Sequence, residues 1–75
     1  MLELKLRQID AMPFCKKLNK LKSSFDVHSR RIIVDGKSII GLCSLDYTNP
    51  LYLDCILEDG EDLEYIKEHL KDYLK

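Results

Sequence analysis

The chain has 75 residues, which is room for one domain but not for separate cofactor-binding and substrate-binding halves. Its hydrophobic fraction of 45% and charged fraction of 33% are typical of a folded protein, and its net charge of −1 excludes a broadly basic nucleic-acid-binding surface. No apolar run approaches the length of a membrane span and the first residues do not form a signal peptide, so we expect one cytoplasmic domain over residues 1–75 without membrane insertion.

The first part of the chain predicts a strand, a helix and a hairpin. Leucine alternates with charged residues over positions 2–7, which is the period of a half-buried strand. Asp10 then offers a helix cap, with Pro13 tolerated in the first turn. The apolar stripe of this helix is Phe14, Leu18, Leu21 and Phe25. Two short runs on either side of Ser29-Arg30 predict a tight antiparallel hairpin.

The second part predicts a short helix, a strand and a final helix. Ser38 can cap a helix that turns Ile39, Leu42 and Leu45 inward. A turn at Asn49-Pro50 leads into a strand over residues 51–57. The segment Asp59-Gly60-Glu61-Asp62 opens the last helix, and its acidic residues suit the helix dipole. Its apolar positions are Leu63, Ile66, Leu70, Tyr73 and Leu74.

The element order is therefore β-α-β-β-α-β-α. One-sided strands are accounted for by a single sheet that carries all helices on one face. We predict an α+β fold, an open-faced β-sandwich with one four-stranded antiparallel sheet and three helices on one face of it.

Charge is divided unevenly along the chain. Residues 1–40 hold nine basic and four acidic residues, whereas residues 41–75 hold three basic and nine acidic ones. A local basic patch in the first part would suit an acidic protein partner.

Cysteine and histidine spacing gives no sign of a metal or redox site. Cys15, Cys43 and Cys55 form no Cys-x-x-Cys pair, so neither a zinc ribbon nor a redox dithiol is encoded. His28 and His69 have no neighbouring nucleophile or carboxylate at the spacing of a triad or a metal site. We predict reduced thiols, no metal and no cofactor.

Gly36-Lys37-Ser38 follows a predicted strand and precedes a helix, which invites a phosphate-loop interpretation. That loop needs a glycine five residues before the Gly-Lys-Ser, and position 31 is Arg. We therefore reject nucleotide binding. Ser38 remains at a helix N-terminus, as an ordinary cap or as a place where a phosphoryl group would be stabilised.

The segment from Lys37 to Leu45, Lys-Ser-Ile-Ile-Gly-Leu-Cys-Ser-Leu, resembles the Lys-Ser-Ile-Met-Gly-x-x-Ser-Leu segment of the HPr family. These proteins are phosphocarriers of the bacterial phosphoenolpyruvate-dependent sugar phosphotransferase system. The family shares the element order, the length and a glycine-acid approach to the last helix, here residues 58–62. The resemblance covers essentially the whole chain, with a shorter central hairpin here.

The family's phosphate-carrying motif is His-x-Arg-Pro at the start of the first helix. Here Asp10-Ala11-Met12-Pro13 keeps the proline, but Asp10 holds the histidine position and Met12 the arginine position. Moving the alignment by one residue brings Ile9 or Ala11 there, and neither supplies an imidazole. We expect a divergent member that lacks the catalytic residue and is not an enzyme.

The resemblance implies a different role for Ser38. In some HPr-like proteins the serine of this segment is phosphorylated by an ATP-dependent kinase, and a class concerned with carbon catabolite repression keeps it without the carrier histidine. Ser38 is thus a candidate regulatory phosphorylation site. The partner-binding residues that the resemblance implies are Met12, Phe14, Lys16, Lys20, Lys37, Ile39 and Ile40.

Three functions are open at this point. The first is a regulatory interaction protein whose partners are phosphotransferase-system components, an HPr serine kinase or a transcription regulator. The second is a phosphocarrier with a non-standard acceptor, Asp10 or a histidine brought close by the fold. The third is a binding module unrelated to sugar transport, with self-association through the exposed sheet face or the first helix.

Overall fold

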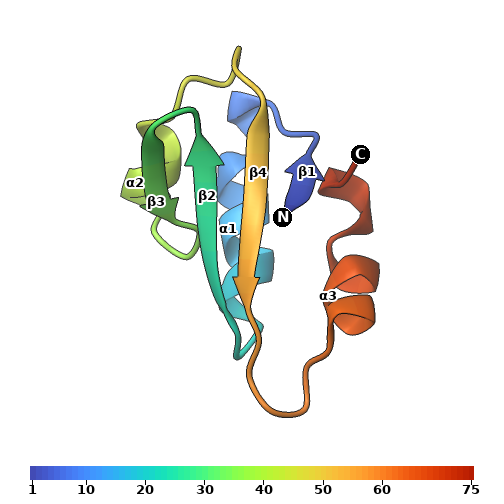
Figure 1. Ribbon diagram of the computed structural model, residues 1–75. Coiled ribbons are helices and arrows are strands. Elements are labelled where there is room, and N and C mark those ends of the chain that lie inside the picture. Colours follow the sequence, from blue (N-terminus) through green and yellow to red (C-terminus); the bar gives the residue numbers. More distant parts are fainter.

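The computed structural model describes all 75 residues, and its elements follow the predicted order (Figure 1). Short 3₁₀ turns precede the first helix and follow the last. The elements are β1 (Leu2–Leu4), η1 (Gln8–Asp10), α1 (Ala11–Asn19), β2 (Ser24–Ser29), β3 (Ile32–Asp35), α2 (Ile39–Cys43), β4 (Leu51–Ile56), α3 (Leu63–His69) and η2 (Lys71–Tyr73). None of the helices is long and apolar enough to cross a membrane.

The four strands form one sheet in the order β1-β4-β2-β3. Every neighbouring pair is antiparallel, with Leu53 of β4 opposite Leu2 of β1 and Val27 of β2, and Val27 opposite Val34 of β3. The predicted α+β class, with one open four-stranded antiparallel sheet and three helices, is therefore confirmed.

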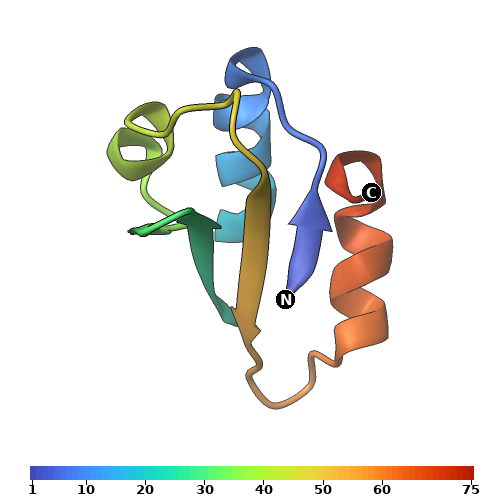
Figure 2. The same ribbon diagram turned by 45° about the horizontal axis from the view of Figure 1, so that its top comes forward.

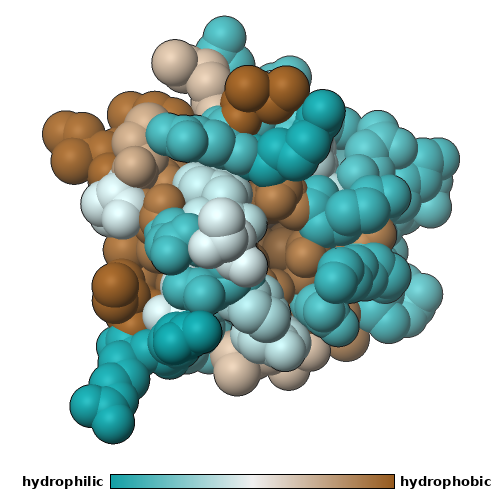
Figure 3. All heavy atoms as spheres, turned by 90° about the horizontal axis from the view of Figure 1, so that it is seen from above, coloured by the Kyte–Doolittle hydropathy of each residue, from teal (hydrophilic) through white to brown (hydrophobic).

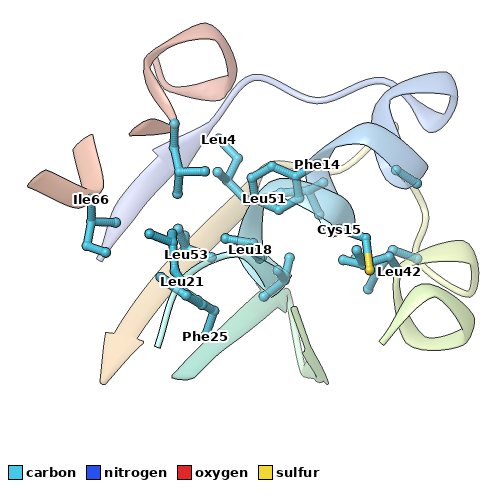
Figure 4. Close-up of a cluster of buried hydrophobic side chains, with 14 residues drawn as sticks. Leu4, Phe14, Cys15, Leu18, Leu21, Phe25, Leu42, Leu51, Leu53 and Ile66 are labelled. Carbon is cyan, nitrogen blue, oxygen red and sulfur yellow. The ribbon is translucent and has the colours of Figure 1, made fainter. Parts of the chain in front are cut away.

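A single core lies between the sheet and the helices (Figure 4). Alternate strand residues point into it because successive side chains of a strand face opposite sides. All three helices contribute to this same core, with Phe14 from α1, Leu42 from α2 and Ile66 from α3. The helices thus lie on one face of the sheet and leave the other face open (Figure 2).

The helix α1 is shorter than its apolar stripe predicts. It ends at Asn19, and Phe25 belongs to β2 although both Leu21 and Phe25 are buried in the core. The backbone amides of Lys22 and Ser23 donate to the Glu61 carboxylate at 2.8 Å instead of continuing the helix. A side chain distant in the sequence therefore ends the helix.

The hairpin turn lies one residue later than predicted. Ser29 is the last residue of β2 and pairs with Ile32, so that Arg30 and Arg31 form the turn. Arg30 has a φ of 56°, the left-handed conformation that tight two-residue hairpin turns require. At the other end of the chain, β4 stops at Ile56 and α3 at His69, one residue and several residues short of the predicted ends.

The two edges of the sheet differ. The outer side of β1 is covered by the end of the chain: the Lys5 amide donates to the Tyr73 carbonyl at 2.7 Å, and the Lys75 amide to the Glu3 carbonyl at 3.1 Å. β3 at the other edge has β2 as its one hydrogen-bonded neighbour.

Exposed apolar side chains gather near β3 and α2. Ile32, Ile33 and Ile40 are 53%, 58% and 82% exposed. Figure 3 views the molecule from above, with hydrophobic atoms along the side where Figure 1 has α2 and β3 and hydrophilic atoms on the opposite side. The surface around these two elements is therefore one apolar flank of the molecule.

Candidate functional site

Helices α1 and α2 border a surface groove of about 490 Å³. Its lining residues are Met12, Cys15, Lys16, Asn19, Lys20, Lys37 and Ile39. Five of them are partner-binding residues that the resemblance implies, namely Met12, Lys16, Lys20, Lys37 and Ile39. The fold therefore brings together, from two helices and the turn before α2, residues that were selected from the sequence.

The turn between β3 and α2 passes close to α1 at Gly36. A Cβ atom at this position would lie 2.8 Å from Cδ1 of Leu18 on α1 and 3.1 Å from Cβ of Phe25 on β2. Only a residue without a side chain lets the turn pass this close to α1. The glycine of Gly36-Lys37-Ser38 thus has a packing role.

Two side chains of α1 bind the turn before α2. The Asn19 side-chain amide donates to the carbonyl of Lys37 at 3.1 Å and to that of Cys15 at 2.9 Å. The buried Cys15 thiol also donates to the Lys37 carbonyl, at 3.4 Å. These contacts fix the floor of the groove. No local spacing in the sequence indicates them, because residues 15 and 19 meet residue 37 only through the fold.

The positive charge of the groove comes from two lysines of α1. Lys16 and Lys20 are exposed, and neither has an ion-pair partner in the chain. The ammonium group of Lys37 is directed elsewhere, to the Leu21 carbonyl at 2.7 Å and over the Phe25 ring at 5.9 Å from its centre. Lys37 therefore contributes its backbone and stem to the groove.

Ser38 lies at the N-cap of α2, as predicted. Its Oγ accepts a hydrogen bond from the Gly41 amide at 3.2 Å, and the side chain is half-buried. Ile40, two residues further along the chain on α2, and Met12 on α1 are 82% and 55% exposed. The capping serine therefore lies between apolar side chains that are open to a partner.

Phe14 does not belong to this surface. The resemblance implies a partner-binding role, but its side chain is completely buried and packs edge-on against Tyr73, with 5.3 Å between ring centres. The helical period turns Phe14 toward the sheet while Met12 and Lys16 face outward, so Phe14 is corrected to a core residue.

Asp10 lies at the N-cap position of α1, but its side chain makes no capping bond to that helix. The carboxylate instead accepts from the Arg7 amide at 2.9 Å and from the Arg7 guanidinium at 3.3 Å. These hydrogen bonds, that of the Arg7 amide first, lower the pKa of Asp10. The predicted cap is thus corrected to a link across the 3₁₀ turn η1.

A larger cleft, of about 580 Å³, lies beside Asp10. Two of its three basic side chains already have partners, Arg7 with Asp10 and Lys75 with Glu3. Neither histidine lines this cleft or the α1–α2 groove, so the fold brings no imidazole to Asp10. We therefore regard the smaller groove as the better candidate.

No three or more His, Cys, Asp or Glu side chains are grouped so that they could hold a metal ion. All three cysteines are free thiols, with Cys15 buried, Cys55 half-buried and Cys43 exposed. The groove thus offers apolar contact and positive charge.

Comparison with protein-family models, with curated proteins and with solved structures finds no match to this chain.

Proposed function

We propose that this chain is a non-enzymatic, HPr-like interaction protein of the cytoplasm that binds a partner protein in the α1–α2 groove and is regulated by phosphorylation of Ser38. The partner would be a component of the sugar phosphotransferase system, an HPr serine kinase or a transcription regulator. The HPr-like arrangement of the fold is part of the proposal, and the element order supports it.

The observation that carries the proposal is the composition of the groove. The apolar side chains of Met12 and Ile39 line it, with Ile40 82% exposed on the same helix as Ile39, and two unpaired ammonium groups, of Lys16 and Lys20, lie on one wall. Apolar anchors surrounded by charge are typical of protein interfaces, and the charge selects a partner of opposite sign. An acidic protein surface with an apolar centre fits both features.

Ser38 is suited to control such contacts. A phosphoryl group adds a charge of about −2 and strong hydrogen-bond acceptors. At Ser38 it would stand at the amides of α2 and next to Ile39 in the groove wall. Phosphorylation would then reduce the net positive charge of the surface and weaken the binding of an acidic partner.

The phosphocarrier alternative receives less support. Asp10 is held by two groups of Arg7, and the groove and the adjacent cleft contain no histidine. Exposure to phosphoenolpyruvate and the first enzyme of the system should leave the chain unmodified. A hydroxylamine-sensitive phosphoryl group at Asp10 would reverse this assessment.

The first experiment is intact-mass analysis after incubation with ATP, Mg²⁺ and an HPr serine kinase. We expect the wild type to gain the mass of one phosphoryl group and Ser38→Ala to gain none. No gain by the wild type would remove the support for regulation and leave a binding module unrelated to sugar transport.

Recognition of the groove is tested with the same kinase. Ile40→Ala should lower kcat/KM for phosphorylation, since it removes an exposed apolar contact next to Ser38. The matched control is Ile9→Ala, a comparably exposed isoleucine on η1, at 74% exposure against 82%. Equal kcat/KM values for the two variants would count against this docking surface.

A further inference from the structure

The open edge of the sheet at β3 carries unusual features for a surface strand. It consists of Ile32–Asp35, and both isoleucines are more than half exposed, at 53% and 58%. An edge strand presents unpaired amides and carbonyls, which other strands can pair with unless lysine, proline or a covering segment prevents it. β3 contains neither lysine nor proline. The chain therefore leaves a pairing surface here.

The hydrogen-bonding direction of β3 can be assigned residue by residue. The Gly36 amide donates to the Phe25 carbonyl of β2 at 2.8 Å. Because these bonds alternate along an antiparallel pair, Val34 and Ile32 also face β2, whereas Ile33 and its odd-numbered neighbours face outward. The Asp35 carbonyl already accepts from the Ser38 amide at 3.0 Å, whereas the amide and carbonyl of Ile33 have no partner in the chain, so Ile33 is at the centre of the free edge.

An unbalanced row of acids crosses the open face of the sheet and ends at this edge. Asp26 of β2 is directly opposite Asp35 of β3 on one side and Asp54 of β4 on the other. None of the three has an ion-pair partner in the chain. Like charges directly opposite each other destabilise a sheet, so a basic group from outside the chain would be favoured beside Asp35.

Arg31, the turn residue directly before β3, would supply that basic group from a second copy. An antiparallel pair about a two-fold axis at Ile33 places Arg31 of each copy opposite Asp35 of the other, because opposite residue numbers then add to a constant. An axis at Ile32 would put Arg31 opposite Ile33, and an axis at Val34 would put Arg31 opposite Lys37. Only the axis at Ile33 pairs opposite charges, and it also joins the outward-facing amides.

We propose that β3 is a self-association edge, at which two copies pair antiparallel about Ile33 to make one continuous sheet of eight strands. The contact is isologous, as is usual for homodimers. It is independent of the proposed function, since neither Arg31 nor Ile33 lines the α1–α2 groove. A four-residue strand buries little surface, so the dimer is weak and depends on protein concentration.

The test is sedimentation equilibrium of the full chain at concentrations up to about 1 mM, which covers weak association. We expect a wild-type monomer–dimer equilibrium. Arg31→Glu and Asp35→Arg should each weaken the dimer by about tenfold or more, since both charge pairs become repulsive. Lys5→Glu, an exposed charge reversal at the opposite edge, is the matched control and should leave the equilibrium unchanged.

The deciding step is to mix the two variants. An Arg31→Glu chain and an Asp35→Arg chain have complementary charges only in the proposed register, so the mixture should dimerise as the wild type does. A monomeric wild type, a dimer indifferent to both reversals, or a mixture that stays monomeric would each overturn the proposal.

A second variant guards against misfolding, because the Asp35 carboxylate also accepts from the Lys37 amide at 2.9 Å. Ile33→Lys leaves every hydrogen bond within the chain in place and puts two lysines face to face at the axis. It should abolish the dimer, and Ile9→Lys, at a 74% exposed position elsewhere, should not. Equal dimerisation of these two variants would also refute the pairing.

Discussion

The two edge strands of the sheet, β1 and β3, differ in how far the rest of the chain covers their outward-facing amides and carbonyls. At β1 the last residues of the chain cover the edge, with the Lys5 amide bonded to Tyr73 and the Lys75 amide bonded to Glu3. At β3 the Ser38 amide donates to the Asp35 carbonyl at 3.0 Å, but nothing in the chain bonds the outward amide and carbonyl of Ile33, and Ile32 and Ile33 are exposed. An uncovered apolar edge is avoided in most soluble domains. The contrast indicates that one edge is closed for stability and the other is available for association.

The largest loss of stability is expected when the residue that anchors the covering segment at the β1 edge is truncated. Leu70 is fully buried and stands where α3 ends and the covering segment begins. Leu70→Ala should lower the free energy of unfolding by about 2–5 kcal/mol, since it leaves a cavity in the core. Urea denaturation followed by circular dichroism measures this.

The control for that change is Leu63→Ala in the same helix. Leu63 is 39% exposed, so its truncation removes much less buried surface. Similar losses for the two variants would mean that the covering segment is not anchored through Leu70.

A smaller loss of stability is expected from a change in the turn between β3 and α2. Gly36→Ala should cost about 1–3 kcal/mol, because the new methyl group meets Leu18 at 2.8 Å and Phe25 at 3.1 Å. The measurement is the shift of the urea midpoint. A double-mutant cycle with Leu18→Ala checks the cause: the two changes should cost less together than the sum of each alone.

A pH-dependent link joins the segment before β2 to the loop between β4 and α3. Glu61 accepts from the Ser23 hydroxyl at 2.6 Å and from the amides of Ser23 and Lys22, and these bonds, led by that of the hydroxyl, lower its pKa. A carboxyl with a lowered folded-state pKa stabilises the fold above its unfolded value, and this is lost as pH falls through the folded value.

Glu61→Gln should therefore lower the free energy of unfolding near neutral pH and reduce the loss of stability on acidification, so that the variant and the wild type converge at low pH. Denaturant titrations from neutral pH to below about pH 5 measure this. Glu64→Gln, an exposed residue of α3, is the control and should keep the wild-type profile. A wild-type profile for Glu61→Gln would show that the link does not contribute.

The least invasive comparison uses amide hydrogen exchange. The Lys5 amide at the covered edge should exchange roughly a hundredfold or more slowly than an unprotected one, because it opens only with the segment that covers it. In dilute solution the Ile33 amide should exchange freely. Its exchange should slow as protein concentration rises, while that of Lys5 should not. If the Lys5 and Ile33 amides exchanged at the same rate at all protein concentrations, the proposed difference between the two edges would be refuted.

The sequence predicts the elements better than it predicts their ends. Alternation identifies β1 and β4 because their inner residues, such as Leu4 and Leu53, are buried and their outer ones are not. The apolar stripe that includes Leu21 and Phe25 predicts a longer helix than α1. Residues four apart can be buried in the same core whether they belong to one helix or to a chain that turns back after the helix. Bonds from Glu61, distant in sequence, decide between these cases.

The candidate site shows the same division. Outward-facing residues such as Lys16, Lys20 and Ile39 could be chosen from helical spacing and from the resemblance, and they do line one groove. Asn19 and Cys15 could not, because their partner is the carbonyl of Lys37, a contact made only after folding. Backbone acceptors carry no signature in the amino-acid sequence.

The burial of Cys15 beneath the groove gives the molecule a built-in reporter. Its thiol faces the carbonyl of Lys37 and is shielded, whereas Cys43 on α2 is open to reagents and Cys55 is slowed because burial raises its thiol pKa. Alkylating agents should thus label Cys43 first, Cys55 next and Cys15 last. The labelling rate at Cys15 then reports how often α1 and α2 separate. A ligand bound between the two helices would slow this labelling.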